Sequence, residues 1–234
     1  MELNNKNVLI TGGSSGIGKA TAKMLIEKGA NVAITGRDKT KLEKVAHEIG
    51  AFPIQADVSN QADVDRTYEE FLAKFKSLDV LINNAGFSTK TAPLKDVNID
   101  DFNKVYQTNV VGAAMMGQKA ANLFIAQNHG NIINIASSSG VKGYENGSVY
   151  VASKFALRGM TQCWQAELRK HNVRVFLVNP SYVATAFFTD DSTPMPEEDN
   201  KLRGQEIAHC ICSCLEMDNR GFIPEVSVWA TNPF

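Results

Sequence analysis

The segment VLITGGSSGIGKATAKMLIEKG, residues 8–29, decides the fold. It starts with a short apolar and β-branched run, residues 8–11, which predicts a buried strand. A glycine-rich turn follows at residues 12–18, and the next residues carry apolar side chains at helical spacing until Gly29. Strand, glycine turn and helix in this order predict the first unit of an α/β protein with a phosphate-binding turn.

The glycines of this turn have separate roles in such a unit. Gly12 allows the strand to turn sharply, Gly16 lets the backbone approach a pyrophosphate, and Gly18 lets the helix pack closely on the strand. The pyrophosphate would lie over the helix N-terminus, where free N–H groups and the helix dipole favour an anion. The alternative is a glycine-rich turn without a ligand, and the flanking strand and helix argue against it.

The end of the second predicted strand, residues 31–35, indicates which dinucleotide binds. Gly36 stands where an acidic residue would bind the ribose hydroxyls, and Arg37 follows it. Because a guanidinium suits a ribose 2′-phosphate, this pattern predicts NADP rather than NAD. Asp38 is expected to cap the next helix, and Ser15 in the glycine turn adds no second positive charge. The alternative for Arg37 is a solvated loop arginine.

The rest of the chain continues the alternation of strands and helices, which predicts a parallel sheet. Further strands are predicted at residues 52–56, 78–82, 130–135, 173–178 and 222–229, with helices at residues 39–49, 63–75, 100–127, 148–170 and 205–217. We therefore expect one α/β domain spanning residues 1–234, a Rossmann-type doubly wound parallel sheet of about seven strands with helices on both faces, in three αβα layers. A polar stretch with little periodicity, about residues 182–204, predicts a substrate loop.

Composition narrows the range of functions. The chain has 234 residues, 44% of them apolar, and a net charge of −1, which provides no field to attract nucleic acid or an anionic membrane. We find no secretory segment and no apolar run of membrane-spanning length. Cys163, Cys210, Cys212 and Cys214 lack CxxC spacing, so we expect free thiols in a reducing cytoplasm and no metal; a metal site near His209 is the weaker alternative.

Tyr150 and Lys154 lie four residues apart on a predicted helix, so their side chains share one face. A phenol ordinarily has a pKa near ~10. A fixed ammonium beside it favours the phenolate, so we expect Lys154 to lower the pKa of Tyr150 toward the working range. Without other evidence, an interfacial tyrosine beside a solvated lysine would be the simpler interpretation. The glycine turn favours the catalytic one.

Several polar residues follow other strands, at the edge of the sheet where ligands bind in open α/β folds. Asp57 and Val58 are suited to bracket an adenine ring, or else to start a helix. Residues 83–86, Asn-Asn-Ala-Gly, allow backbone to lie against a flat ligand, although such a turn is common in any loop. Residues 137–139 are serines. Asn109, in the middle of a predicted helix, reads by itself as a buried structural amide.

Taken together, TGxxxGIG at residues 11–18, NNAG at residues 83–86, Asn109, Ser137 and YxxxK at residues 150–154 resemble the short-chain dehydrogenase/reductase family. Their order and spacing match the family over nearly the whole chain. The resemblance implies that Asn109, Ser137, Tyr150 and Lys154 are the catalytic residues, which makes Asn109 a member of the proton relay. It also implies cofactor contacts at Gly12, Ser14, Ser15, Gly16, Ile17, Gly18, Arg37, Asp57, Val58, Asn83, Ala85, Gly86, Tyr150, Lys154, Pro180, Val183 and Thr185.

The chain departs from the family pattern in two places. Pro180-Ser181 replaces the usual Pro-Gly after the sixth strand. The C-terminal segment, residues 221–229, lacks the glycine-rich ending of acyl-carrier-protein reductases, which argues against that particular reductase and its tetramer. We expect a homodimer or homotetramer in which the helices at residues 100–127 and 148–170 form the dimer faces.

The sequence thus predicts hydride transfer between NADP(H) and a small-molecule carbonyl or secondary alcohol, with Tyr150 as general acid and base. A narrower alternative is a 3-oxoacyl thioester reductase acting on acyl-carrier protein or CoA substrates, for which Lys142 and Arg203 are faint signals. A different class of alternative is a regulatory protein that binds NADP without turnover. Candidate substrate-side residues are Phe87, Tyr144, Tyr182, Phe187, Phe188 and Met195.

Overall fold

The computed structural model describes residues 1–185, 187 and 198–233. Within them, seven parallel strands form one sheet in the order β3-β2-β1-β4-β5-β6-β7. The strands are β1 (Asn7–Ile10), β2 (Asn31–Gly36), β3 (Phe52–Gln55), β4 (Val80–Asn83), β5 (Gly130–Ile135), β6 (Val173–Pro180) and β7 (Glu225–Val228). The direction of winding reverses between β1 and β4, so the carboxyl ends of these two strands flank the switch point of the sheet.

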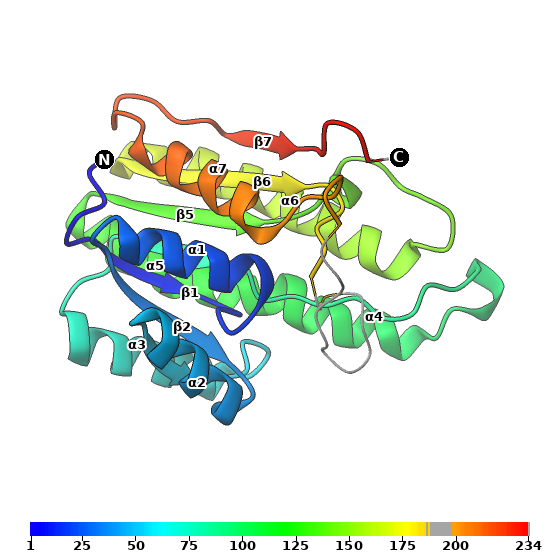
Figure 1. Ribbon diagram of the computed structural model, residues 1–234, viewed down its shortest axis with the longest axis horizontal. Coiled ribbons are helices and arrows are strands. Elements are labelled where there is room, and N and C mark those ends of the chain that lie inside the picture. The colour runs from blue at the N-terminus through cyan, green and yellow to red at the C-terminus, as the bar shows by residue number, and fades with distance from the viewer. Residues whose placement is uncertain (186, 188–197, 234) are drawn as a thin grey trace.

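Helices cover both faces of this sheet, which confirms the predicted three-layer Rossmann-type fold (Figure 1). They are α1 (Gly16–Glu27), α2 (Lys39–Ile49), α3 (Gln61–Phe75), α4 (Ile99–Tyr106), α5 (Ala113–Gln127), α6 (Ser148–Leu168) and α7 (Gly204–Glu216). Apolar residues of α1, α2 and α7 form one core with one side of the sheet, and those of α3, α5 and the end of α6 form the other. Side chains alternate between the two cores along β1, where Val8 and Ile10 enter the first and Leu9 the second.

The long helix expected at residues 100–127 is interrupted. Between α4 and α5, the segment Gln107–Gly112 is π-helical, and Asn109 lies buried in it. Its side chain is fully engaged by neighbours outside the helix, as described below, and such π-turns often occur at functional sites. The pattern of apolar residues predicted the helix but not this local widening.

Other differences are at element boundaries. The strand predicted at residues 222–229 is only Glu225–Val228, and the predicted helix at 148–170 ends as α6 at Leu168, followed by a 3₁₀ turn. Asp38 caps α2 as predicted, because its side chain accepts a hydrogen bond from the Lys41 backbone N–H at 3.0 Å. In the part of the chain that the structure describes, no helix has the length and apolarity needed to cross a membrane.

Candidate active site

A cleft of about 680 Å³ opens at the carboxyl ends of the central strands and collects most of the predicted site residues. Those that line it are Gly12, Ser14, Ser15, Gly16, Ile17, Arg37, Asp57, Val58, Ala85, Gly86, Ser137, Tyr150, Lys154, Pro180, Val183 and Thr185. The predicted residues Gly18, Asn83 and Asn109 do not line it. Residues from both halves of the sheet therefore face one cavity, at the switch point where such folds bind ligands.

The glycine turn has the features needed to hold a diphosphate. Gly12 and Gly16 have positive φ angles of 65° and 51°, a conformation that side chains with a Cβ disfavour. The N-terminus of α1 has no side-chain cap and no acidic residue in its first turn. By contrast, side chains of Asp38, Asn60 and Asn98 cap α2, α3 and α4. The open, positive end of α1 faces the cleft, so the residues present fit the pyrophosphate of a dinucleotide.

Gly18 and Asn83 support the cleft from behind. A Cβ at Gly18 would clash with the Gly12 carbonyl and the Asn84 side chain, so this glycine allows α1 to pack against the turn. The Asn83 amide donates to Asn134 Oδ1 at 2.9 Å and to the Ala113 carbonyl at 3.3 Å. Asn83 therefore ties β4 to β5 and α5, and the nucleotide contact expected for Gly18 and Asn83 stays a prediction.

Thr11 and Asn84, which were not among the predicted site residues, join β1 to β4 beside the cleft, as expected of asparagine side chains in this segment. The Thr11 hydroxyl accepts hydrogen bonds from the backbone N–H groups of Asn84 and Ala85, each at 3.0 Å. The Asn84 amide donates to the carbonyls of Thr11 and Gly12, at 2.9 and 3.0 Å. These bonds hold the glycine turn against the Asn-Asn-Ala-Gly segment. Thr11 belongs to the TGxxxGIG motif and Asn84 to the NNAG motif, so their positions in these motifs could have indicated a role in the site.

At one end of the cleft, two cationic side chains lie near the end of β2. Arg37 is exposed and Lys41 is half-buried, and both line the cleft. Among the described residues neither has a carboxylate partner, because the Asp38 carboxylate is engaged in capping α2. A Cβ at Gly36 would lie 3.1 Å from the Ser14 hydroxyl, so the glycine leaves this corner open. The sequence analysis did not identify Lys41 as a site residue. A basic residue in the first turn of a helix opposes the helix dipole, and this unusual placement could have drawn attention to it.

Asp57 and Val58 lie at the end of β3 and line the same part of the cleft. Asp57 Oδ1 accepts hydrogen bonds from the Ser59 backbone N–H at 2.9 Å and from the Ser59 hydroxyl at 2.7 Å. The loop that presents both residues to the cleft is therefore held by its own hydrogen bonds.

Tyr150 and Lys154 lie on α6 and both are buried, with 8% and 4% of their surface exposed. The Lys154 ammonium donates to the Ile135 carbonyl at 2.9 Å and lies 5.6 Å from the centroid of the Tyr150 ring. Burial lowers the pKa of Lys154 to about 8.

The pKa of Tyr150 corrects a prediction made from the sequence. Burial of the phenol raises this pKa above its ordinary value, and a hydrogen bond with Ser137 counteracts the rise only in part. Lys154 is not among the groups that shift this pKa, so the lowering expected from Lys154 is absent. A phenol with a raised pKa is protonated at neutral pH but is a weaker acid than a free phenol, so its proton donation depends on groups that stabilise the phenolate.

Asn109 links three parts of the site. Its Nδ2 donates to the Phe87 carbonyl at 2.9 Å and to the Ser153 hydroxyl at 3.1 Å, while its Oδ1 accepts from the Phe87 N–H at 3.0 Å. The Ser153 hydroxyl in turn donates to the Tyr150 carbonyl at 2.7 Å. The Asn109 side chain thus joins the loop after β4 to the helix that carries Tyr150. This agrees with the structural role that its position in the sequence suggested before the family resemblance was considered.

The predicted substrate-side residues are only partly brought together. Phe87 and Phe187 line the cleft, and the Phe187 ring packs edge-on against Tyr150 with centroids 5.5 Å apart. Tyr144 and Tyr182 are exposed and outside the cleft lining. Phe188, Met195 and the rest of residues 188–197 in the predicted substrate loop lie outside the described residues. Lys142 is exposed, and Arg203 pairs with Asp199 at 3.3 Å at the start of α7.

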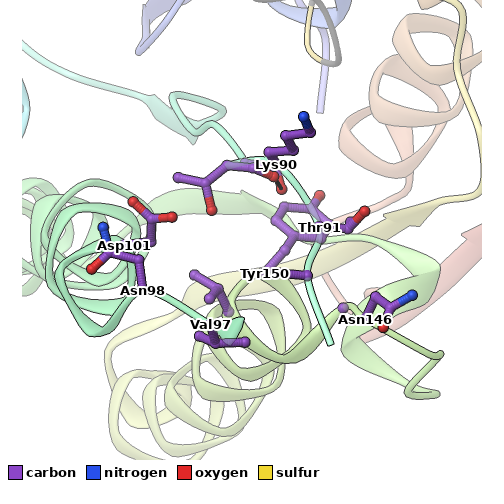
Figure 2. Close-up of a pocket in the computed structure, with 12 residues that line it drawn as sticks. Lys90, Thr91, Val97, Asn98, Asp101, Asn146 and Tyr150 are labelled. Atoms are coloured by element: carbon purple, nitrogen blue, oxygen red, sulfur yellow. Dashed lines mark hydrogen bonds between the residues drawn. The ribbon is translucent and has the colours of Figure 1, made fainter. Parts of the chain in front are cut away.

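A second, small cavity adjoins Tyr150 on the side of α4 (Figure 2). It holds about 20 Å³ and lies between the loop after β4, the start of α4 and the start of α6. Tyr150 and Ser88 line both this cavity and the main cleft. Apart from Tyr150, none of the residues that line this cavity was predicted from the sequence.

Comparison with known proteins places this geometry in a family. Residues 6–195 match the profile of short chain dehydrogenases. An uncharacterized oxidoreductase of Staphylococcus aureus (strain USA300) is 32% identical over 229 residues, covering 97% of each chain.

Solved structures agree. A 3-ketoacyl-(acyl-carrier-protein) reductase from Brucella melitensis, complexed with NADH, is similar with a TM-score of 0.90 and 30% identity, covering 99% of this chain and 100% of its own. An alcohol dehydrogenase from Thermococcus sibiricus, complexed with 5-hydroxy-NADP, has a TM-score of 0.89 and 27% identity, covering 97% of both chains. The chain belongs to the short-chain dehydrogenase family of nicotinamide-dependent oxidoreductases.

Proposed function

We propose that this protein transfers a hydride between NADP(H) and a small carbonyl compound or secondary alcohol, with Tyr150 as general acid and base. One observation carries this proposal: Ser137, Tyr150 and Lys154 line the same cleft as the uncapped N-terminus of α1. A dinucleotide with its diphosphate over α1 therefore shares its cavity with a buried proton donor.

In the direction of reduction, the bound nicotinamide supplies the hydride that forms the new C–H bond. The Ser137 and Tyr150 hydroxyls donate hydrogen bonds to the carbonyl oxygen and stabilise negative charge as it develops. Tyr150 then gives its proton to that oxygen, so that the products are the alcohol and NADP⁺, and the phenolate regains a proton from solvent. Lys154 stabilises the phenolate while it exists and holds the nicotinamide ribose hydroxyls. Asn109 positions the helix that carries Tyr150 and lies close to the route by which the phenolate regains its proton.

The preference for NADP(H) over NAD(H) is supported by two cations rather than the single one predicted. Arg37 and Lys41 line the cleft without carboxylate partners among the described residues, and Gly36 leaves room between them and Ser14. Two positive charges with a hydroxyl nearby suit a ribose 2′-phosphate. The carboxylate of Asp38, in this part of the cleft lining, caps α2 through the Lys41 N–H.

A 3-oxoacyl thioester reductase is the second candidate. It is favoured by the similarity to the Brucella melitensis reductase over the whole chain. Against it, the Arg203 guanidinium pairs with Asp199 at 3.3 Å at the start of α7. A regulatory protein that binds NADP without turnover is the weakest alternative, because such a protein has no use for a buried Tyr150 beside Ser137.

A screen of small ketones and acetoacetyl-CoA, each with NADPH and with NADH, tests these functions. We expect turnover of small ketones with NADPH as the better cofactor. Faster turnover of acetoacetyl-CoA than of every ketone would identify the thioester reductase. Tight NADPH binding in a fluorescence titration with no turnover of any compound would identify the regulatory protein.

We also propose an assembly and a cellular location for this protein. Apolar side chains on the predicted dimer helices are exposed: Ile125 on α5 and Phe155 on α6 have 40% and 42% of their surface accessible. Their exposure supports a homodimer or homotetramer formed through these helices. All four cysteines are free, which supports a reducing cytoplasm.

A further inference from the structure

The small cavity beside Tyr150 has the size of one polar group. Its volume of about 20 Å³ is close to what a single water molecule, hydroxyl or ammonium needs. Because Tyr150 and Ser88 line both this cavity and the main cleft, a substituent in the cavity lies beside a carbon reacting in the cleft.

The lining of the cavity is polar and includes one carboxylate that faces no partner. Asp101 is half-buried, and among the described residues its side chain takes part in no hydrogen bond or ion pair. Lys90 also belongs to the lining, but it is exposed, and in Figure 2 its ammonium points away from Asp101. The Asp101 carboxylate is therefore the acceptor in this lining that is free to take a hydrogen bond from a group entering the cavity.

The position of Asp101 in the first turn of α4 does not by itself account for this arrangement. An acidic residue there stabilises the helix dipole, but Asp100 is in the same turn and is exposed to solvent. The Asn98 side chain already caps the helix by accepting from the Asp100 N–H at 3.0 Å. Asp101 differs from Asp100 in lining the cavity beside Tyr150.

We propose that this cavity is a substrate subsite for a hydrogen-bond donor, a hydroxyl or an ammonium, carried close to the reacting carbon. Asp101 accepts the hydrogen bond from this group, and Val97 and Val149 limit its size. The preferred substrates are then short compounds in which the reacting alcohol or ketone has a neighbouring hydroxyl or amino substituent. This inference rests on the proposed oxidoreductase function.

Isosteric alcohols test the subsite. Propane-1,2-diol, 1-aminopropan-2-ol and butan-2-ol differ only in carrying a hydroxyl, an ammonium or a methyl group next to the reacting carbon. Butane-1,3-diol and pentan-2-ol extend the comparison by one carbon. Each is oxidised with NADP⁺, and kcat and KM are measured separately. We expect at least one donor compound to exceed its methyl isostere by about 10-fold or more in kcat/KM, because a polar subsite rejects an analogue that leaves it unpaired.

Two matched variants assign the effect to this cavity. Asp101→Asn removes the charge and keeps the shape, so the ratio between donor and methyl compounds should shrink several-fold, and most for the ammonium. Asp100→Asn makes the same change in the same helical turn outside the cavity, and the ratio should stay as in the wild type. A larger effect on the amino alcohol than on the diol identifies an ammonium as the preferred donor, and the reverse identifies a hydroxyl.

Two results would overturn the inference while leaving the proposed function in place. One is turnover of every alcohol with equal kcat/KM for the donor and methyl compounds. The other is a donor preference that Asp101→Asn does not change, or that both variants change equally. If NADP⁺ binds and no alcohol or ketone is turned over, the proposed function fails and the subsite fails with it.

Discussion

At the level of single residues, the site is built from groups that the fold holds at an energetic cost. Lys154 is buried with one hydrogen bond to a neutral carbonyl, and Tyr150 is buried beside it. Burying an ammonium without a carboxylate destabilises a protein, so such residues persist where function requires them. The cost of Lys154 is visible in its lowered pKa of about 8.

The substitution Lys154→Met should therefore stabilise the protein while abolishing turnover. Because the folded-state pKa of Lys154 is depressed to about 8, the unfolded chain binds more protons than the native one above that pH. Wild-type stability should then gain up to about 1.4 kcal/mol per pH unit between pH 8 and 10 from this residue. Urea unfolding at several pH values checks this. The gain should be missing in Lys154→Met, and an identical rise in both proteins would contradict the account.

Cofactor choice depends on Arg37 and Lys41. Replacing either by Gln removes a charge facing the 2′-phosphate and should raise the Kd for NADPH by about 10-fold or more, with little change for NADH. The double variant should bind both cofactors alike. Lys39→Gln is the control, since Lys39 is exposed and lies 3.9 Å from Glu43 on the same helix. Equal losses for NADPH and NADH would remove the 2′-phosphate from the explanation.

Residue types and spacing predicted which side chains meet in the cleft, but not their energetics. Ser137, Tyr150 and Lys154 were expected together, and they line one cavity. The direction of the Tyr150 pKa shift was wrong, because burial depends on packing from several distant segments. Lys41 was missed for a similar reason: only the folded structure shows that the first turn of α2 faces the cleft.

At the level of elements, the π-helical turn between α4 and α5 is the feature that the sequence did not reveal. Apolar periodicity continues through residues 100–127, so the pattern predicted one helix. The side chain of Asn109 makes three hydrogen bonds to Phe87 and Ser153, which are remote in sequence. The pattern of apolar residues along one helix cannot predict such contacts. Capping was more predictable, as Asp38 shows, because it is a local interaction.

Replacing Asn109 by Ala should lower both stability and turnover. The change leaves the half-buried Phe87 N–H and carbonyl without their partner, at a cost of about 1–3 kcal/mol. It also frees the loop after β4 from the helix of Tyr150. Urea unfolding and steady-state kinetics measure the two effects. Asn103→Ala, an exposed substitution on α4, should change neither. Full stability of Asn109→Ala would show that the bonds are dispensable.

For the whole molecule, the parallel sheet and the three layers followed from the alternation of strands and helices along the chain, whereas the strand order came from the structure. Assembly did not follow in the same way, because the pattern of apolar residues is similar for a core and for an interface. The exposure of Phe155 on α6 shows that this apolar side chain is not part of the core, and it is therefore assigned to the proposed interface.

Phe155→Glu should weaken the assembly, because it places a charge in an apolar contact between copies of the chain. Light scattering after size-exclusion chromatography should report a smaller mass than for the wild type, while the thermal unfolding midpoint at equal concentration reports on retained folding. A wild-type protein that is already a monomer would contradict the proposed homodimer or homotetramer.

The central claim is that a phenol and a bound dinucleotide share one cleft and one reaction. The most direct measurement compares kcat and the NADPH Kd of the wild type with those of Tyr150→Phe, on whichever ketone the wild type reduces. The account predicts that kcat falls by about 10²–10⁴-fold while the Kd stays nearly the same, because the variant loses only the proton donor. Unchanged turnover in Tyr150→Phe would contradict it.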